Sequence, residues 1–136
     1  KDTKMNVAMI KVGLTGCDVG ISYFLPRSVG QSIAAELMMT GRLIDAERAE
    51  KINLVSKVVD KNDLEETGSQ MAKDMLQTSA MGLCFTKEGL NISIDANSLE
   101  SIIALEDRGQ ILCSAAGYFK EGIDAFKERR PPDYSE

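Results

Sequence analysis

The side chains best suited to chemistry lie in a glycine-rich stretch near the start of the chain. Gly13, Gly16 and Gly20 fall within eight residues. Glycine allows positive φ and a close approach of one backbone to another, so this spacing predicts a tight loop rather than a helix. Asp18 is the only carboxylate in that loop. If the loop faces a cavity, Asp18 is the group that could transfer a proton there.

Asp18 and its neighbour Cys17 also have structural interpretations. A loop aspartate often accepts hydrogen bonds from backbone N–H groups in a turn, so Asp18 is either an acid/base or a turn residue. Cys17 has no basic residue beside it that would stabilise a thiolate. This favours a small buried apolar side chain over a nucleophile.

Composition excludes several classes of site. The chain has 136 residues, 43% of them hydrophobic, which is enough for one domain with a core. It contains no histidine, which excludes Ser-His-Asp and Cys-His catalysis within the chain. Its three cysteines are widely spaced and form no CxxC pair. We therefore expect no disulfide framework and no metal site, and a reducing compartment.

Charge and hydropathy narrow the range of partners. The net charge of −5 argues against a nucleic-acid partner, which would require clustered basic residues. No apolar run approaches the roughly 20 residues needed to cross a bilayer, and the first residues lead into no secretory sequence. We expect no membrane partner and a cytoplasmic location, or an organelle matrix in a eukaryote.

The elements that must position the loop are short. Val7–Val12 is an apolar run that predicts a buried strand or a turn leading into the loop. After the loop, Ser22–Val29 and Gln31–Thr40 are predicted to be helices. Gly41 supplies the left-handed stop that commonly ends a helix.

The chain then continues through a further short helix. Asp45 is placed to cap Ala46–Ile52, because its carboxylate can accept hydrogen bonds from first-turn amides. Asn53 falls where the end of that helix needs positive φ. Leu54–Val59 has the composition of a short strand or an extended segment.

The second half of the chain predicts four longer amphipathic helices. Asn62 with Glu65, and Asn97 with Glu100, have the spacing of capping boxes, and Ser79 can cap the helix between them. The chain is therefore predicted to be mainly α. Because catalytic loops usually hang on a sheet, we expect the sheet-bearing half of the fold to lie upstream. The four helices run from about Asn62 to Gln77, Ser79 to Ile94, Asn97 to Ser114 and Tyr118 to Arg130.

Three sequence blocks, in this order, carry a resemblance to a known family. They are VGLTGCDVGISYFLPRSVG, AAELMMTGRLIDAERAEKINLVSKVV and FKEGIDAFKERRPPDY. Together they resemble the C-terminal half of the crotonase superfamily, the enoyl-CoA hydratase/isomerase group. The resemblance implies the C-terminal helical part of a ClpP/crotonase-like α/β spiral fold. Residues 1–30 would form the end of the core with its active-site loop, and residues 31–136 the helical trimerisation region.

The resemblance also implies a reaction. Such an enzyme acts on an unsaturated acyl-CoA thioester through an enolate that two backbone amides stabilise in an oxyanion hole. Both amides belong to sequence upstream of this chain, so the segment alone is expected to be inactive. No cofactor is implied beyond the coenzyme A of the substrate, and no metal. A homotrimer or hexamer is implied.

Site residues follow from the resemblance position by position. The second acid of hydratases falls at Met9, which cannot transfer protons, and Asp18 would replace it as in the dienoyl-CoA isomerase branch. Met9, Val12 and Gly13 would line the acyl pocket. Met9 suits core filling equally well. Hydration and isomerisation both remain open.

The end of the chain supplies the remaining candidates. By the same resemblance, Phe119 and Arg129 would contact coenzyme A. A basic group such as Lys127, Arg129 and Arg130 is usually a solvated helix end that complements the helix dipole. An alternative to the enzyme also stands. The chain could be a non-catalytic helical oligomerisation module without an active site of its own.

Overall fold

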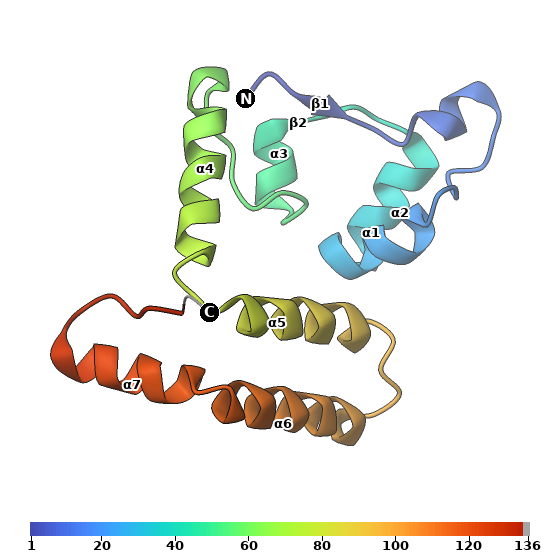
Figure 1. Cartoon of the computed structure of the whole chain (residues 1–136). Helices are drawn as coiled ribbons and strands as arrows, with labels where there is room; N and C mark the ends of the chain where they lie inside the picture. The colour runs from blue at the N-terminus through green and yellow to red at the C-terminus, as the bar shows by residue number, and fades with distance from the viewer. Residues whose placement is uncertain (135–136) are drawn as a thin grey trace. The chain divides into compact units, whose positions relative to one another are not determined.

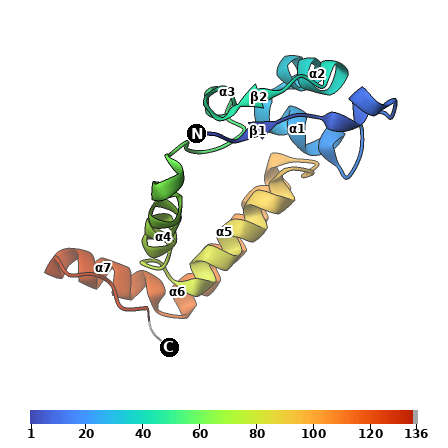
Figure 2. The ribbon, with the colours of Figure 1, turned by 90° about the horizontal axis from the view of Figure 1, so that it is seen from above.

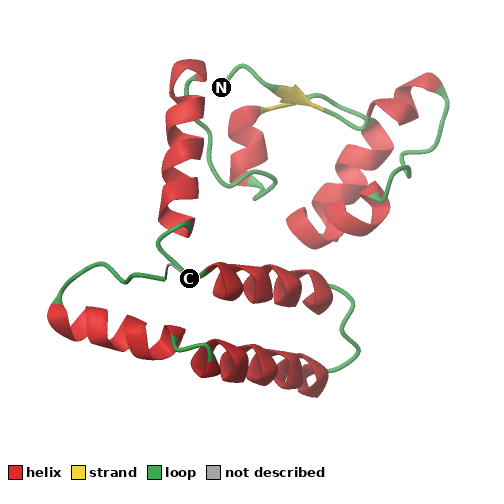
Figure 3. Ribbon diagram, viewed as in Figure 1, coloured by secondary structure: helices red, strands yellow, loops and turns green. Residues whose placement is uncertain are grey.

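The computed structural model describes residues 1–134 and divides the chain into two compact units. The first unit comprises Lys1–Thr67 and the second begins at Gly68. Helices make up most of both, as Figure 3 shows by colour. The prediction of a mainly α chain is therefore confirmed.

The first unit joins a two-stranded ribbon to three helices. Strand β1 pairs antiparallel with β2, so that Lys4 lies opposite Asp45 and Met5 opposite Ile44. Helices α1 and α2 pack side by side after the glycine-rich segment (Figures 1 and 2). In chain order its elements are β1 (Lys4–Met5), the 3-10 helix η1 (Ala8–Val12), α1 (Ile21–Val29), α2 (Gln31–Thr40), β2 (Ile44–Asp45), α3 (Ala46–Lys51) and the 3-10 helix η2 (Lys61–Asp63).

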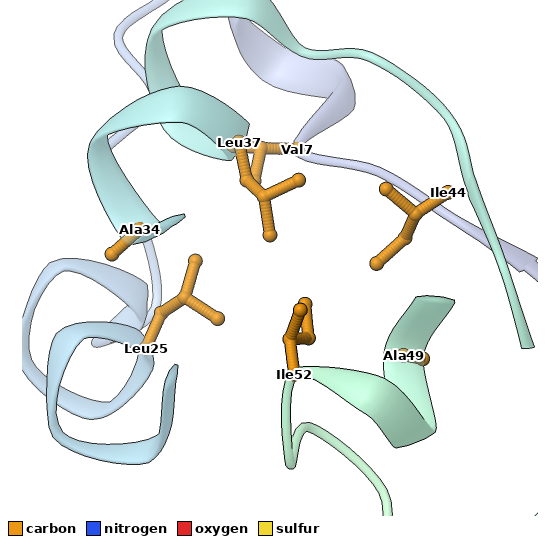
Figure 4. Close-up of a cluster of buried hydrophobic side chains, with 7 residues drawn as sticks. All are labelled: Val7, Leu25, Ala34, Leu37, Ile44, Ala49 and Ile52. Atoms are coloured by element: carbon orange, nitrogen blue, oxygen red, sulfur yellow. The ribbon is translucent and has the colours of Figure 1, made fainter. Parts of the chain in front are cut away.

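A small apolar cluster holds these elements together. Figure 4 shows Leu25 of α1, Leu37 of α2, Ile44 of β2 and Ile52 pointing toward one another. Ala34 on α2 is 1% exposed. Burial of such side chains is the main favourable term in folding, so this cluster fixes where α1 and α2 stand. Its members are Val7, Leu25, Ala34, Leu37, Ile44, Ala49 and Ile52.

Three predicted helix signals are confirmed in this unit. Gly41 ends α2 with φ 57° and donates its N–H to the Leu37 carbonyl. The Asp45 carboxylate caps α3 by accepting the Arg48 N–H at 2.8 Å. Asn53 follows α3 with φ 60°. Each signal is local, because it depends only on residues within the same turn of chain.

Two apolar runs differ from a strand interpretation. Residues 8–12 form the 3-10 helix η1. The predicted turn leading into the loop is therefore confirmed, and the alternative prediction of a strand is wrong. Leu54–Val59 forms no strand. The Leu54 N–H is bonded to the Ala49 carbonyl, and the Val58 N–H to Glu50 Oε1. These backbone donors are satisfied by α3, and β-propensity without a partner strand does not make a strand.

The second unit is a helical hairpin extended by a third helix. Helix α4 (Leu64–Met75) crosses the boundary between the units. Within the second unit, α5 (Ala80–Ser93) and α6 (Leu99–Ala115) pack antiparallel, as Figure 1 shows, and α7 (Tyr118–Glu128) follows after a turn at Gly117. A Cβ added at Gly109 of α6 would stand 3.6 Å from Phe85 of α5.

The capping predictions in this half are partly wrong. Ser79 caps α5 as predicted, accepting the Gly82 N–H at 3.0 Å. Ser98 rather than Asn97 caps α6, because its hydroxyl lies one residue closer and accepts the Ser101 N–H at 3.2 Å. Asn62 lies inside η2 and forms no capping box. Adjacent capping residues compete, and the first turn of the helix decides between them.

Burial differs sharply between the two units. Helices α4, α5 and α6 contain no buried residue, and α7 buries only Ala125. Large apolar side chains on α6, such as Leu99 at 70% and Ile111 at 67%, are exposed. No helix among residues 1–134 is long and apolar enough to span a membrane. The packing boundary between the two units lies between residues 67 and 68. It does not test the predicted division by role at residue 30, which stays a prediction.

The Asp45 cap gives a direct test of this local analysis. Asp45→Ala leaves the Arg48 N–H without its acceptor and should destabilise the fold by about 1 kcal/mol in urea unfolding followed by circular dichroism. Asp45→Asn is the matched control, because its amide oxygen still accepts the bond. Equal losses in both variants would show that the cap bond contributes nothing.

Candidate active site

The glycine loop, residues 13–20, starts where η1 ends. Gly13 has φ 84° and donates its N–H to the Met9 carbonyl, and Leu14 donates to the same carbonyl at 3.1 Å. Thr15 Oγ1 then accepts the Cys17 N–H and donates to the Cys17 carbonyl. These bonds give the loop a defined course toward α1.

Asp18 occupies the turn that leads from the loop into α1. Its carbonyl accepts the Ile21 N–H at 2.9 Å, and Val19 and Gly20 both have positive φ, as in a type I′ turn. The φ of Val19 is 43°, which is strained for a β-branched residue, and its side chain is 91% exposed. Strain of this kind is found most often at functional positions.

The carboxylate of Asp18 serves the turn and is also exposed. Oδ1 accepts the Val19 N–H at 2.8 Å, so the turn interpretation of Asp18 is confirmed. Oδ2 has no hydrogen-bond partner among residues 1–134. One oxygen therefore holds the backbone while the other faces solvent, and the acid/base role stays a prediction.

A hollow lies beside this turn, between the loop, α1 and α2. Its lining includes Cys17 from the loop, Ser22 and Pro26 from α1, and Met38 from α2. The Cys17 side chain is exposed, so the expectation that it is buried is wrong. Cys17 lines this hollow and its side chain remains exposed to solvent.

The predicted pocket residues differ in their surroundings. Met9 is half-buried and packs against the apolar cluster, which is the core-filling role. Val12 is 75% exposed, and a Cβ at Gly13 would meet nothing within 4 Å. The structure brings these three residues onto one turn. Their contact with an acyl chain stays a prediction.

Phe119 and Arg129 lie at opposite ends of α7, in the second unit. Phe119 is 66% exposed in the first turn. Arg129 ends the helix with φ 55°. Its side chain forms no ion pair with the residues that the structure describes. Both side chains are accessible, and their role toward coenzyme A stays a prediction.

Arg130 behaves differently from its neighbour, which the sequence did not indicate. Its two terminal nitrogens bind the Glu121 carboxylate at 2.6 and 3.0 Å, and Nε binds Glu128 at 2.6 Å. Glu121 Oε1 also accepts the Asp133 N–H at 2.7 Å. We call these contacts of Glu121 and Arg130 the tail clamp. It forms because Arg129 turns the chain back along α7, and no helical spacing relates Glu121 to Arg130.

The clamp shifts the ionisation of its members. Hydrogen bonds from Arg130 and from the Asp133 amide lower the pKa of Glu121 to about 2. The two carboxylates raise the pKa of Arg130 above its usual value. Both groups therefore remain charged at neutral pH. Within the basic group Arg130 is paired, whereas Arg129 forms no ion pair with the residues that the structure describes.

Comparison with known proteins identifies the family. The model of the enoyl-CoA hydratase/isomerase family matches residues 2–136, nearly the whole chain. The chain belongs to the enoyl-CoA hydratase/isomerase family. The resemblance drawn from the glycine loop and the two helical blocks is confirmed.

Individual family members are similar to this chain in sequence. The chain is 38% identical over 130 residues to a Mycobacterium tuberculosis protein named Probable enoyl-CoA hydratase EchA12, which covers 95% of this chain and 46% of that protein. It is 30% identical to 1,2-epoxyphenylacetyl-CoA isomerase of Escherichia coli, covering 99% and 51% of the two chains.

A solved structure confirms the fold. The crystal structure of a probable enoyl-CoA hydratase/isomerase from Mycobacterium abscessus superposes with a TM-score of 0.93 at 37% identity, covering 96% of this chain and 50% of that one. The chain thus spans about half the length of the relatives that it matches. The prediction that it is the helical C-terminal part of a crotonase-like fold is confirmed.

The tail clamp predicts a defined dependence on pH. Because the pKa of folded Glu121 is depressed from 4.5 to about 2, the clamp contributes fully above pH 4.5 and is lost as pH falls through 2. Glu121→Gln should reproduce that loss at neutral pH. Hydrogen exchange at the Asp133 amide should then accelerate several-fold, because a neutral amide binds a guanidinium more weakly than a carboxylate does.

Asp124→Asn is the matched control for the clamp. It removes another carboxylate of α7, one that pairs with Lys120. Exchange at Asp133 should stay at the wild-type rate. If Glu121→Gln and Asp124→Asn exchange alike, the clamp does not hold the tail.

Proposed function

We propose that this chain is the C-terminal half of an acyl-CoA enzyme that acts on an unsaturated acyl-CoA thioester. The observation that carries the proposal is the family match over residues 2–136, together with relatives about twice as long that are named as an enoyl-CoA hydratase and a CoA-thioester isomerase. The reaction passes through a thioester enolate. Two backbone amides outside this chain stabilise it, so the chain alone is inactive.

Asp18 is the acid/base of this half in the proposed reaction. Its Oδ2 forms no hydrogen bond within residues 1–134, and its Oδ1 holds the turn. This supports the role, since a proton carrier needs both a fixed position and access. Met9 has a thioether, which carries no proton. This favours a proton shift between carbons over hydration by two carboxylates. Neither reaction needs an oxidant or a reductant.

The substrate-binding residues extend the same proposal. Val12 and Gly13 present an exposed turn to the acyl chain, with Met9 behind them. Phe119 and Arg129 contact coenzyme A. The support for Arg129 is that its guanidinium forms no ion pair with the described residues, whereas Arg130 is held by two carboxylates. The coenzyme A of the substrate is the only cofactor, and no metal takes part.

Association into a homotrimer or hexamer is also proposed. Helices α4, α5 and α6 bury no residue of their own, and an apolar surface of this extent is typical of an interface. The same observation favours the alternative function, a non-catalytic oligomerisation module. Activity of the full-length protein distinguishes the two. A location in the cytoplasm, or in an organelle matrix in a eukaryote, completes the proposal, since one relative is named as mitochondrial.

Replacing Asp18 tests the catalytic part. In the full-length protein, Asp18→Asn should lower kcat by about 10²-fold or more on enoyl- or dienoyl-CoA substrates. The asparagine oxygen can still accept the Val19 N–H, so the turn is retained. Cys17→Ala, one residue away, is the control and should keep wild-type turnover. Full activity of Asp18→Asn would remove Asp18 from the mechanism.

Sedimentation equilibrium tests the association. The full-length protein should sediment with the mass of three or six chains. Ile111→Asp, which puts a charge on an exposed apolar site of α6, should weaken association about tenfold or more. Gln110→Asp adds the same charge at an adjacent polar position and should have a smaller effect. A wild-type monomer at micromolar concentration would contradict the proposal.

A further inference from the structure

We infer that Gly16 and Gly41 are positioning residues that fix the glycine loop on the C-terminal end of α2 and so determine where Asp18 stands. The inference rests on the proposed function, in which Asp18 moves a proton. It concerns two residues that act through the position of the loop.

Gly16 is the one buried residue of an otherwise exposed loop. A Cβ added there would stand 2.6 Å from the Met38 carbonyl oxygen and 3.3 Å from the Met38 carbonyl carbon. Real Cβ atoms do not approach that closely, and the obstacle is helix backbone, which cannot move aside as a flexible side chain can. The φ of Gly16 lies outside the left-handed region. Space alone therefore requires glycine at this position.

Gly41 fixes the segment that enters the loop. A Cβ there would stand 2.5 Å from Ile10 Cγ2 and 3.0 Å from the Val7 carbonyl oxygen, and its φ of 57° disfavours any side chain. The Gly41 carbonyl also accepts a hydrogen bond from Asn6 Nδ2 at 3.1 Å. The end of α2 thus contacts the chain both before and within the glycine loop.

Asp18 lies between two points that α2 holds. Gly16 stands two residues before it, against Met38, and α1 begins three residues after it and packs on α2. The chain between these points is too short to absorb a displacement. A side chain at Gly16 that lifts the loop from Met38 therefore moves the carboxylate, and a misplacement of about 1 Å can cost about 10²-fold in rate.

The other glycines provide a contrast within the same chain. A Cβ at Gly13 would meet nothing, although its φ is positive. At Gly68, inside α4, a Cβ would meet nothing and φ is ordinary. Gly68→Ala is therefore the matched control, because it adds the same methyl group without a close approach or strain.

The first measurement does not depend on activity. In the full-length protein, hydrogen exchange at Leu14, Val19 and Ile21 reports on the loop, since their amides form its internal bonds. Gly16→Ala should accelerate exchange at these amides about tenfold relative to wild type and Gly68→Ala. Unchanged exchange would overturn the inference whatever the activity of Asp18→Asn.

The second measurement is a double-mutant cycle on turnover. Gly16→Ala should lower kcat by about 10²-fold with KM within about threefold, because the loop moves the reacting group more than the bound thioester. In the Asp18→Asn background it should lower kcat by less than about threefold further, because its effect acts through Asp18. If the kcat losses of Gly16→Ala and Asp18→Asn multiply in the double variant, the inference is overturned.

One outcome separates the inference from the proposed function. An active Asp18→Asn protein whose loop loosens on Gly16→Ala overturns the acid/base proposal and supports the anchoring of the loop.

If Gly16→Ala does not fold, Asn6→Ala replaces it, since it removes only the bond to Gly41. It should accelerate loop exchange a few-fold, and a wild-type rate would overturn the inference.

Discussion

The candidate site depends on one constraint, the contact of the glycine loop with the backbone at the end of α2. Two glycines make it possible, because a Cβ at Gly16 would meet the Met38 carbonyl and a Cβ at Gly41 would meet Ile10. Helix α2 is held in turn by Leu37 in the apolar cluster, so the loop takes its position from the core (Figure 4). The turn at Asp18 is held in addition by its own bonds, from the Val19 N–H to Oδ1 and from the Ile21 N–H to the Asp18 carbonyl.

The two units solve the problem of burial in different ways. The first has a small core of seven apolar residues, whereas the second exposes apolar side chains on every helix. Removing such surface from water is worth roughly 25 cal/mol per Å², so exposed faces of this kind gain stability when another surface covers them. The chain spans about half the length of the relatives that it matches, and it superposes on half of the Mycobacterium abscessus structure.

At the C-terminal end, two adjacent arginines differ in their ion pairs. Arg130 is neutralised by Glu121 and Glu128, which hold the tail along α7, while the adjacent Arg129 has no such partner among the described residues. A paired guanidinium offers little to a phosphate, whereas an unpaired one retains its donors. The clamp thus separates two side chains of the same type into a structural and an available group.

The sequence by itself determined what is local: the helices, the left-handed stop at Gly41, the caps at Asp45 and Ser79, and the family, which three ordered blocks identified. Other local predictions were wrong. Ser98, not the adjacent Asn97, caps α6, and the run at residues 54–59 forms no strand because it has no partner strand. Only the tertiary structure decided why Gly16 is glycine, that Cys17 is exposed, and which arginine binds Glu121. These contacts join residues that no helical or strand period relates, so they exist only once packing has brought the segments together.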